Sequence, residues 1–197
     1  MINITFAKSG LLAGCLMLAG VTQVLAQSDA PAKNGTTERD GTAPAVAQVV
    51  ALDECDPTTF NAALGPDFCK NVALAGLGFA TTLDDLFAKA AAGTPDRGWD
   101  FEPDRLTINE GTSLSVADMG GEPHTFTEVK HFGGGFIPGL NAGVGMAPEC
   151  VGGFSKVSVA KTRILQGSHV EVSGLSKGQH KFECCIHPWM HVTVDVQ

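Results

Sequence analysis

The chain has 197 residues, of which 44% are apolar and 24 are glycine, with no tyrosine and a formal net charge of −8. This length suffices for one core-forming domain with additions, and the apolar content excludes a disordered or fibrous protein. The acidic chain has no basic stripe to neutralise phosphates, which argues against a nucleic-acid partner. The abundance of glycine favours turn-rich β structure over a helical bundle.

The first 26 residues are typical of an export signal. Lys8 supplies a positive charge, residues 11–25 form an apolar run too short to span a membrane, and Ala26 ends a cleavage site. A second interpretation stays open, because "LAGC" at 12–15 resembles a bacterial lipobox that would make Cys15 a lipidated membrane anchor. We favour cleavage after Ala26, since the apolar stretch before Cys15 is short. Both interpretations predict a periplasmic or secreted protein, in a compartment where disulfides persist.

Two further segments precede the main domain. Residues 27–48 are small and polar without a period, which predicts a flexible linker. Residues 49–96 contain one helical stretch, "TTLDDLFAKAAAG" at 81–93, with apolar side chains at positions i, i+3, i+4 and i+7. A single amphipathic helix cannot form a core. We therefore expect residues 49–96 to be a short N-terminal helical extension that lies on the following domain.

Residues 97–197 follow a period of two, which indicates β-strands. In "LTINEGTSLSV" at 106–116, apolar and polar residues alternate on both sides of an Asn-Glu-Gly turn. The alternation continues in "HTFTEV", "FSKVSV", "TRIL", "SHVEV", "QHKFEC" and "HVTVDV", with Gly-containing turns between several of them. Short strands of this kind predict an antiparallel sandwich or barrel. We expect an all-β fold in which residues 97–197 form one β-sandwich.

The stretch "HKFECCIHPWMH" at 180–191 gathers metal-binding side chains. Because side chains alternate along a strand, Cys184 shares the more apolar, inward face and ends the strand before a loop that contains proline. His187 and Met190 follow in that loop, and His124, at the start of another strand, is the candidate for a second imidazole. Two histidines, a cysteine and a long axial methionine form the blue-copper arrangement, so the pattern predicts one copper ion.

The adjacent Cys185 offers an alternative sulfur. Its side chain should point to the opposite face of the strand, so we assign Cys184 as the ligand. Outside the export signal, four other cysteines remain, and they allow three pairings into two disulfides. Short spacing favours Cys55–Cys69, which leaves Cys150–Cys185. A plainer interpretation, in which both adjacent cysteines serve disulfides and the histidines are incidental, does not account for four ligand types at matching spacings.

These motifs resemble those of the cupredoxin family. "CCIHPWM" contains the C-x-x-H-P-x-M ligand loop of amicyanin, and "GQHKFEC" resembles the strand before the ligand cysteine. "FEPDRLTINEGTSLSV" and "EPHTFT" resemble the opening hairpin and the first ligand histidine. The resemblance covers residues 97–197 and implies a Greek-key β-sandwich. Carried over residue by residue, the copper ligands are His124, Cys184, His187 and Met190.

The resemblance also implies how the site would be exposed and braced. In the family the loop histidine is partly exposed through an apolar patch, and electrons enter there. The corresponding residue here is His187, with Pro188 and Trp189 beside it. Two departures stand out. Thr125 occupies the place of an asparagine that often braces the site, and Cys185 directly follows the ligand cysteine.

The resemblance implies a type 1 (blue) copper protein that carries one electron outside the cytoplasm, cycling between Cu(II) and Cu(I). Its partner would be a transient redox protein, a cytochrome or a periplasmic oxidoreductase, and we expect a monomer that is not an enzyme. The alternative is copper binding or delivery without physiological electron transfer, with the same ligands. A multicopper enzyme typically uses His-x-His pairs, which the chain lacks, and a cysteine hydrolase has no need of Met190.

Overall fold

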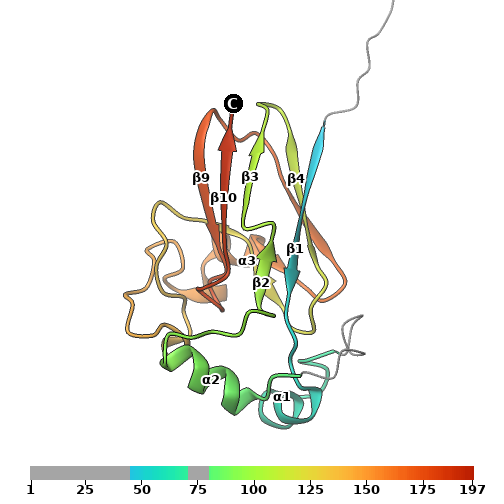
Figure 1. The fold of residues 1–197 in the computed structure, drawn as a ribbon, viewed down its shortest axis with the longest axis vertical. Helices are drawn as coiled ribbons and strands as arrows, with labels where there is room; N and C mark the ends of the chain where they lie inside the picture. The colour runs from blue at the N-terminus through green and yellow to red at the C-terminus, as the bar shows by residue number, and fades with distance from the viewer. Residues whose placement is uncertain (1–44, 71–79) are drawn as a thin grey trace, which may run out of the picture. The chain divides into compact units, whose positions relative to one another are not determined.

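The computed structural model describes residues 45–70 and 80–197, so the predicted export signal and nearly all of the predicted linker lie outside the described residues. Two four-stranded sheets dominate this part of the chain (Figure 1). The first has the strand order β2, β1, β4, β8, formed by Asp100–Glu102, Val46–Leu52, Ser113–Asp118 and His169–Val172. The second has the order β3, β10, β9, β6, formed by Arg105–Ile108, His191–Val196, Gly178–Glu183 and Thr127–Glu128. A two-stranded ladder pairs β5, His124–Thr125, with β7, Arg163–Ile164.

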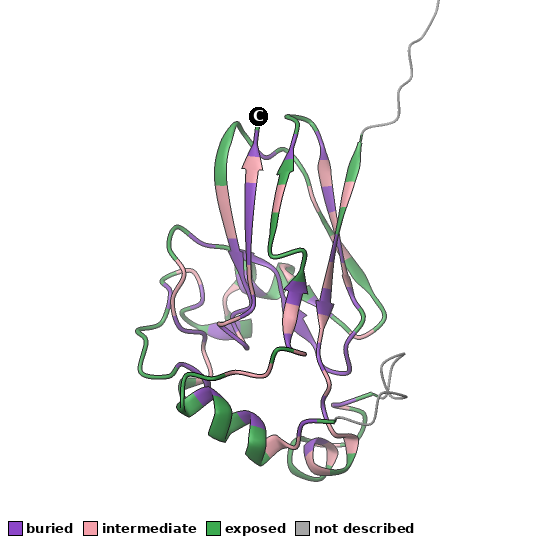
Figure 2. Ribbon diagram, in the orientation of Figure 1, coloured by how far each residue is buried: buried purple, intermediate pink, exposed green. Residues whose placement is uncertain are grey.

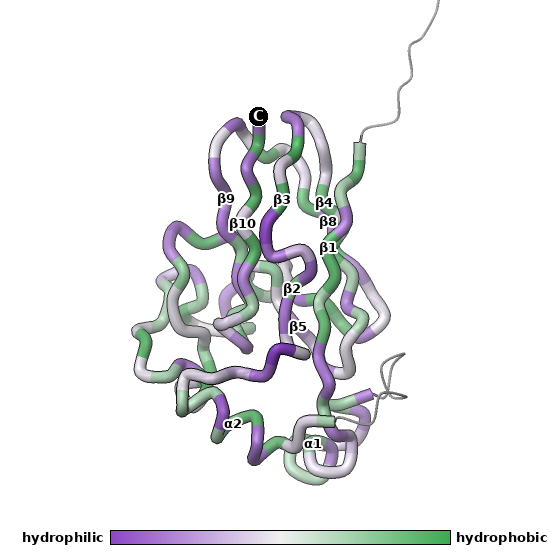
Figure 3. The backbone as a smooth tube through the Cα atoms, in the orientation of Figure 1, coloured by the Kyte–Doolittle hydropathy of each residue, from purple (hydrophilic) through white to green (hydrophobic). Residues whose placement is uncertain are grey.

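The main core lies between the two sheets, where Figure 2 shows the buried residues of the strands. Alternate side chains enter it, such as Leu114 and Val116 from β4, and the hydropathy along the backbone in Figure 3 follows the same alternation. Phe126 stacks on Phe182 at 4.3 Å between ring centroids and meets Phe101 edge-on at 5.2 Å. Burial of each such side chain contributes about 1.5–3 kcal/mol. The predicted all-β sandwich is thereby confirmed.

The sheets are mixed rather than purely antiparallel. β1 pairs with β4 in parallel and β10 pairs with β3 in parallel, whereas the other named strand pairs are antiparallel. Parallel pairs need a long connection and have no hairpin turn. The two parallel pairs therefore could not be predicted from a local pattern in the sequence.

The segment 49–96 differs from the prediction. Its first residues belong to β1, which begins at Val46 and pairs with both β2 and β4, so the sandwich starts before residue 97. Its described residues contain two helices, α1 (Pro57–Leu64) and α2 (Leu83–Ala91), rather than one. The Asp56 carboxylate caps α1 by accepting the N–H groups of Thr58 and Thr59. An Asp followed by a Pro is a helix-start signal, which the prediction of a single helix did not use.

The two helices build a second, smaller core at the end of the sandwich away from the C-terminus (Figure 1). Phe60 from α1 and Leu86 and Ala90 from α2 are buried there together with Trp99. The 3₁₀ turn η1 (Pro138–Leu140) contributes Leu140. Through these contacts the helical part of the segment packs against Trp99 and Leu140.

One predicted strand is wrong. "FSKVSV" forms the 3₁₀ turn η2 (Gly153–Ser155) and the short helix α3 (Val157–Lys161). Gly152 and Gly153 just before it have φ values of 92° and 50°, a left-handed backbone that ends an extended chain. Among the described residues, none of the helices has the length and apolar character needed to cross a membrane.

The stability of the fold is expected to depend on pH through His180 on β9. Its Nδ1 lies 2.6 Å from Glu128 Oε1 and its Nε2 lies 2.8 Å from the Ser176 carbonyl, so both neighbours are acceptors. The bond to Glu128 raises the pKa of His180. The contact therefore stabilises the fold fully below the unfolded pKa of about 6.5, and this contribution is lost as the pH rises through the folded value.

We expect His180→Gln to lower the free energy of unfolding by roughly 0.5 kcal/mol at about pH 6, the size of a partly exposed ion pair, and by less at about pH 9. Urea titrations at both pH values measure the difference. His169→Gln, at an exposed histidine of β8, is the control. A deficit that grows toward high pH would contradict the assignment.

Candidate metal centre

The four predicted ligands lie at the helix-covered end of the sandwich. His124 opens β5, Cys184 directly follows β9, and His187 and Met190 belong to the loop between β9 and β10. All four side chains are buried, with exposed fractions of 0% or 1%. The backbone closes the loop, because the Cys184 N–H donates to the Met190 carbonyl at 3.1 Å and the Met190 N–H to the His187 carbonyl at 3.0 Å.

Three of the ligand atoms converge on one point. Cys184 Sγ lies 3.8 Å from His124 Nδ1 and 3.9 Å from His187 Nδ1, and the two Nδ1 atoms are 3.3 Å apart. The point equidistant from the corners of this triangle is about 2.1 Å from each, within the usual range of metal–nitrogen bonds and slightly shorter than a metal–sulfur bond. The donor set and its dimensions therefore fit one transition-metal ion. Met190 is buried beside them on the same loop.

The surroundings of Cys184 favour the thiolate that a metal requires. The backbone N–H groups of Thr125 and His187 both point at Sγ, at 3.4 Å. Burial alone would raise the pKa of the Cys184 thiol, but hydrogen bonds and charge from the two histidines outweigh it and hold the pKa well below its usual value. In the same way the pKa of His187 is raised to about 9, because its bonds to Cys184 and Glu122 outweigh burial. The cluster thus stabilises positive charge between the sulfur and the two nitrogens.

The other four cysteines in the described part of the chain are paired as the spacing argument favoured. Cys55 bonds to Cys69, and Cys150 bonds to Cys185. Cys184 is the one free cysteine within residues 45–70 and 80–197. Of the two adjacent sulfurs, that of Cys185 is in a disulfide and that of Cys184 lies beside the two histidines.

Thr125, which stands where the family often has a bracing asparagine, makes a bracing hydrogen bond of its own. Its Oγ1 accepts the Cys185 N–H at 2.7 Å, which ties β5 to the end of the ligand strand. The residue after the first histidine therefore fixes His124 and Cys184 relative to each other, although it is not an asparagine.

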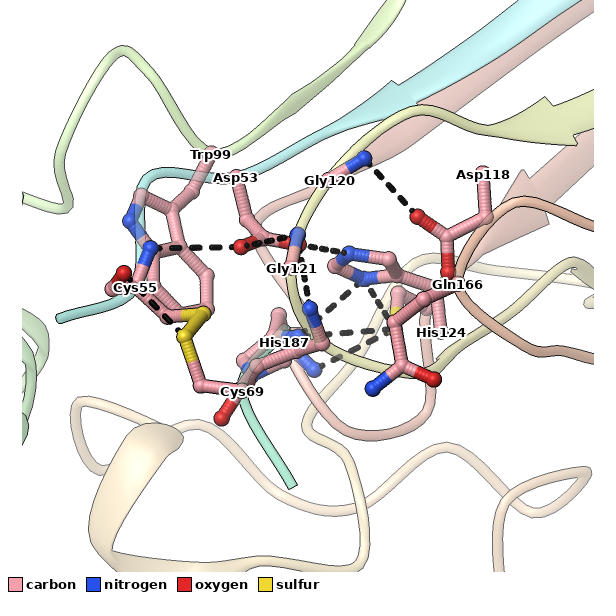
Figure 4. A network of polar contacts seen from close by, with 12 residues as sticks. Asp53, Cys55, Cys69, Trp99, Asp118, Gly120, Gly121, His124, Gln166 and His187 are labelled. Carbon is pink, nitrogen blue, oxygen red and sulfur yellow. Dashed lines mark hydrogen bonds and ion pairs between the residues drawn. A yellow bond between two sulfur atoms is a disulfide. The ribbon is translucent and has the colours of Figure 1, made fainter. Parts of the chain in front are cut away.

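The outer nitrogens of both imidazoles contact buried carboxylates. His124 Nε2 lies 2.9 Å from Asp53 Oδ2 (Figure 4). His187 Nε2 lies 3.0 Å from Glu122 Oε2. Sequence reasoning missed both acids. Glu122 stands two residues before His124, so its position in the sequence could have suggested a contact with the site. Asp53 directly follows β1 and is distant in the sequence from both histidines, so no local pattern pointed to it.

The expected exposure of His187 is wrong. The side chain is 1% exposed, because Trp99 meets its ring edge-on at 4.8 Å between centroids and Trp189 lies at 5.5 Å. The Trp189 Nε1–H donates to the backbone carbonyl of Trp99 at 3.0 Å, which ties the Trp189 indole to the chain at Trp99. Trp99 belongs to the core formed with α1 and α2. Trp99 and Trp189 therefore cover the face of His187 that the family resemblance expected to be open.

Comparisons with known proteins find solved structures of low similarity. No family model matches the chain, and no curated protein matches it. Among solved structures, a purple cupredoxin from Nitrosopumilus maritimus is similar, with a TM-score of 0.38, 14% identity and coverage of 77% of this chain and 99% of that chain. A mutant plastocyanin of fern has a TM-score of 0.36 and 14% identity over 77% of this chain and 100% of its own. A reduced amicyanin mutant has a TM-score of 0.32 and 16% identity over 49% of this chain and 71% of its own. Likeness at this level assigns no function.

Proposed function

We propose that the protein is an extracytoplasmic one-electron carrier with a type 1 copper site. His124, Cys184 and His187 would hold the ion, with Met190 as the weak axial ligand. The observation that carries the proposal is the buried triangle of one sulfur and two Nδ1 atoms, with edges of 3.3 to 3.9 Å. Thiolate with imidazole is the donor set that suits copper.

Copper would supply the one-electron redox chemistry, and the protein would supply a site that holds its shape. Cys184 sits at the end of a paired strand, with its neighbour Cys185 fixed by a disulfide. Thr125 fixes the first histidine to this strand, and the loop backbone holds His187 and Met190. These contacts resist movement of the ligands and exclude water, so the ligand positions would change little between the two oxidation states.

Trp189 connects the buried site to the protein surface, because its ring lies beside that of His187. Together with Pro188, Phe132 and Leu140 it lines an apolar groove at the surface. A transient redox partner would approach the site here, over the indole that lies against His187. We keep a periplasmic or secreted location and a monomer as part of the proposal, with no enzymatic step.

The test is a visible and EPR spectrum of the purified protein loaded with Cu(II). We expect intense thiolate-to-copper charge-transfer absorption and the EPR signature of a type 1 site. A colourless protein, or one with an ordinary tetragonal copper signal, would overturn the proposal. Copper delivery, the alternative function, predicts rapid loss of copper to a chelator. Electron transfer instead predicts slow loss and fast exchange of electrons with a cytochrome.

Replacing the axial ligand is expected to change the potential and leave the copper in place. Met190→Gln substitutes an oxygen donor of similar length for the thioether, and the axial ligand tunes the potential of such sites. We expect the variant to keep its colour while its reduction potential falls, because the harder oxygen favours Cu(II). Voltammetry measures the shift. Loss of copper from the variant would show that Met190 does more than tune the site.

A further inference from the structure

Asp53 is a buried carboxylate surrounded by N–H groups. It follows β1 directly and is 2% exposed. Its Oδ1 accepts the backbone N–H of Gly121 at 2.8 Å and of Cys55 at 3.2 Å. Its Oδ2 accepts the backbone N–H of Glu122 at 2.9 Å and lies 2.9 Å from His124 Nε2 (Figure 4).

These contacts decide which nitrogen of His124 carries the proton. Three of the partners are backbone donors, and the oxygen that faces His124 Nε2 already accepts one of them, the Glu122 N–H. The ionised carboxylate, which accepts all four contacts, is therefore the form that fits this surrounding. A carboxylate can only accept, and therefore His124 must donate from Nε2. The lone pair of Nδ1 then faces Cys184 and His187, which is the orientation that a metal ligand needs.

The chain is shaped to enclose this carboxylate. A Cβ at Gly120 would lie 1.9 Å from Asp53 Oδ2, and a Cβ at Gly121 would lie 2.4 Å from Cys55 Sγ. Only glycines let the loop before His124 approach this closely, and the Cys55–Cys69 disulfide lies against the loop from the other side. Burying a charge is unfavourable unless hydrogen bonds compensate it, so such an enclosure suits a carboxylate with a function.

We propose that Asp53 is a positioning residue of the centre, which holds His124 with Nδ1 inward and lowers the reduction potential through its buried negative charge. This inference rests on the proposed copper function. Cu(II) carries one more positive charge than Cu(I), so a fixed negative charge one imidazole away favours Cu(II). The effect is strong because the site is buried, where charges are poorly screened. Glu122 likewise contacts the Nε2 atom of His187. Each histidine thus has one carboxylate beside it, Asp53 from the N-terminal segment and Glu122 from the loop before His124.

The test compares two carboxylate-to-amide variants. Asp53→Asn removes the buried charge with little change of volume. Asp56→Asn is the matched control, because it makes the same change three residues away at the cap of α1, where asparagine serves as well as aspartate. We expect Asp53→Asn to shift the balance between Cu(I) and Cu(II) at least tenfold toward Cu(I), which raises the potential by about 59 mV for a one-electron couple. Asp56→Asn should leave the potential of the wild type unchanged.

Equal potentials in the two variants, with the wild type coloured, would overturn the role of Asp53 and leave the proposed function intact. A wild type without the charge-transfer band would instead overturn the proposed function. Should Asp53→Asn fail to fold, NMR of the wild type loaded with diamagnetic Cu(I) decides the question. Nitrogen-15 spectra are expected to show His124 bound to the metal through Nδ1, with a slowly exchanging proton on Nε2. A proton on Nδ1 would overturn the proposal.

Discussion

Cys184→Ser is expected to abolish the colour of the copper-loaded protein. The sulfur supplies the charge-transfer band, and a hydroxyl at the same place is a poor ligand for the ion. The change is small in volume, so the sandwich should still form. Absorbance and copper content after desalting measure the result. Full retention of the band would mean that another sulfur binds the ion.

The matched control removes the neighbouring sulfur. Because Cys185 is bonded to Cys150, both are replaced, in Cys150→Ser/Cys185→Ser, so that no stray thiol is left. We expect this variant to keep its band and to lose about 2–5 kcal/mol of stability, the usual effect of removing a native disulfide. Bleaching of the double variant with an intact band in Cys184→Ser would reverse the ligand assignment.

Trp99→Ala is expected to destabilise the protein and open the centre to water. Trp99 is fully buried, stacks on Phe60 at 5.9 Å between ring centroids and covers His187 at 4.8 Å. Truncation of a buried tryptophan of this kind lowers the free energy of unfolding by about 3–5 kcal/mol. The rate at which a chelator removes copper should rise as well, because His187 loses its cover. Urea titration and a chelator assay measure the two effects.

Phe87→Ala is the control for Trp99→Ala. Phe87 lies on α2, close to the same small core, but its side chain is 39% exposed. We expect a smaller loss of stability and an unchanged rate of copper loss. If both variants release copper at the same rate, the cover over His187 does not control access to the ion.

Much of the sandwich could be predicted because its signals are local. The period of two placed β4, β9 and β10 in the sequence. β1 was missed because "VAQVVAL" is rich in small residues and follows a polar stretch, so its alternation did not stand out. Its parallel partner β4 is distant in the chain, and pairing of that kind leaves no trace in the sequence between them.

The residues of the candidate metal centre also fall into those that local sequence patterns predict and those that only the fold brings together. Cys184, His187 and Met190 share one loop, so their spacing was visible, and Pro123 before His124 marked the second element. The contact between Asp53 and His124 joins residues that the fold alone brings together. The cover over His187 was missed for the same reason, since Trp99 reaches it only through the packing of α1 and α2.

The bond between Cys150 and Cys185 has a consequence for the order of maturation. A fully reduced chain presents two adjacent thiols at the end of β9, and a soft metal ion could bind either of them. Once Cys185 is oxidised, one sulfur is left for the ion. Oxidation before metallation therefore leads to a single product, and protein refolded with copper under reducing conditions should contain mis-metallated chains.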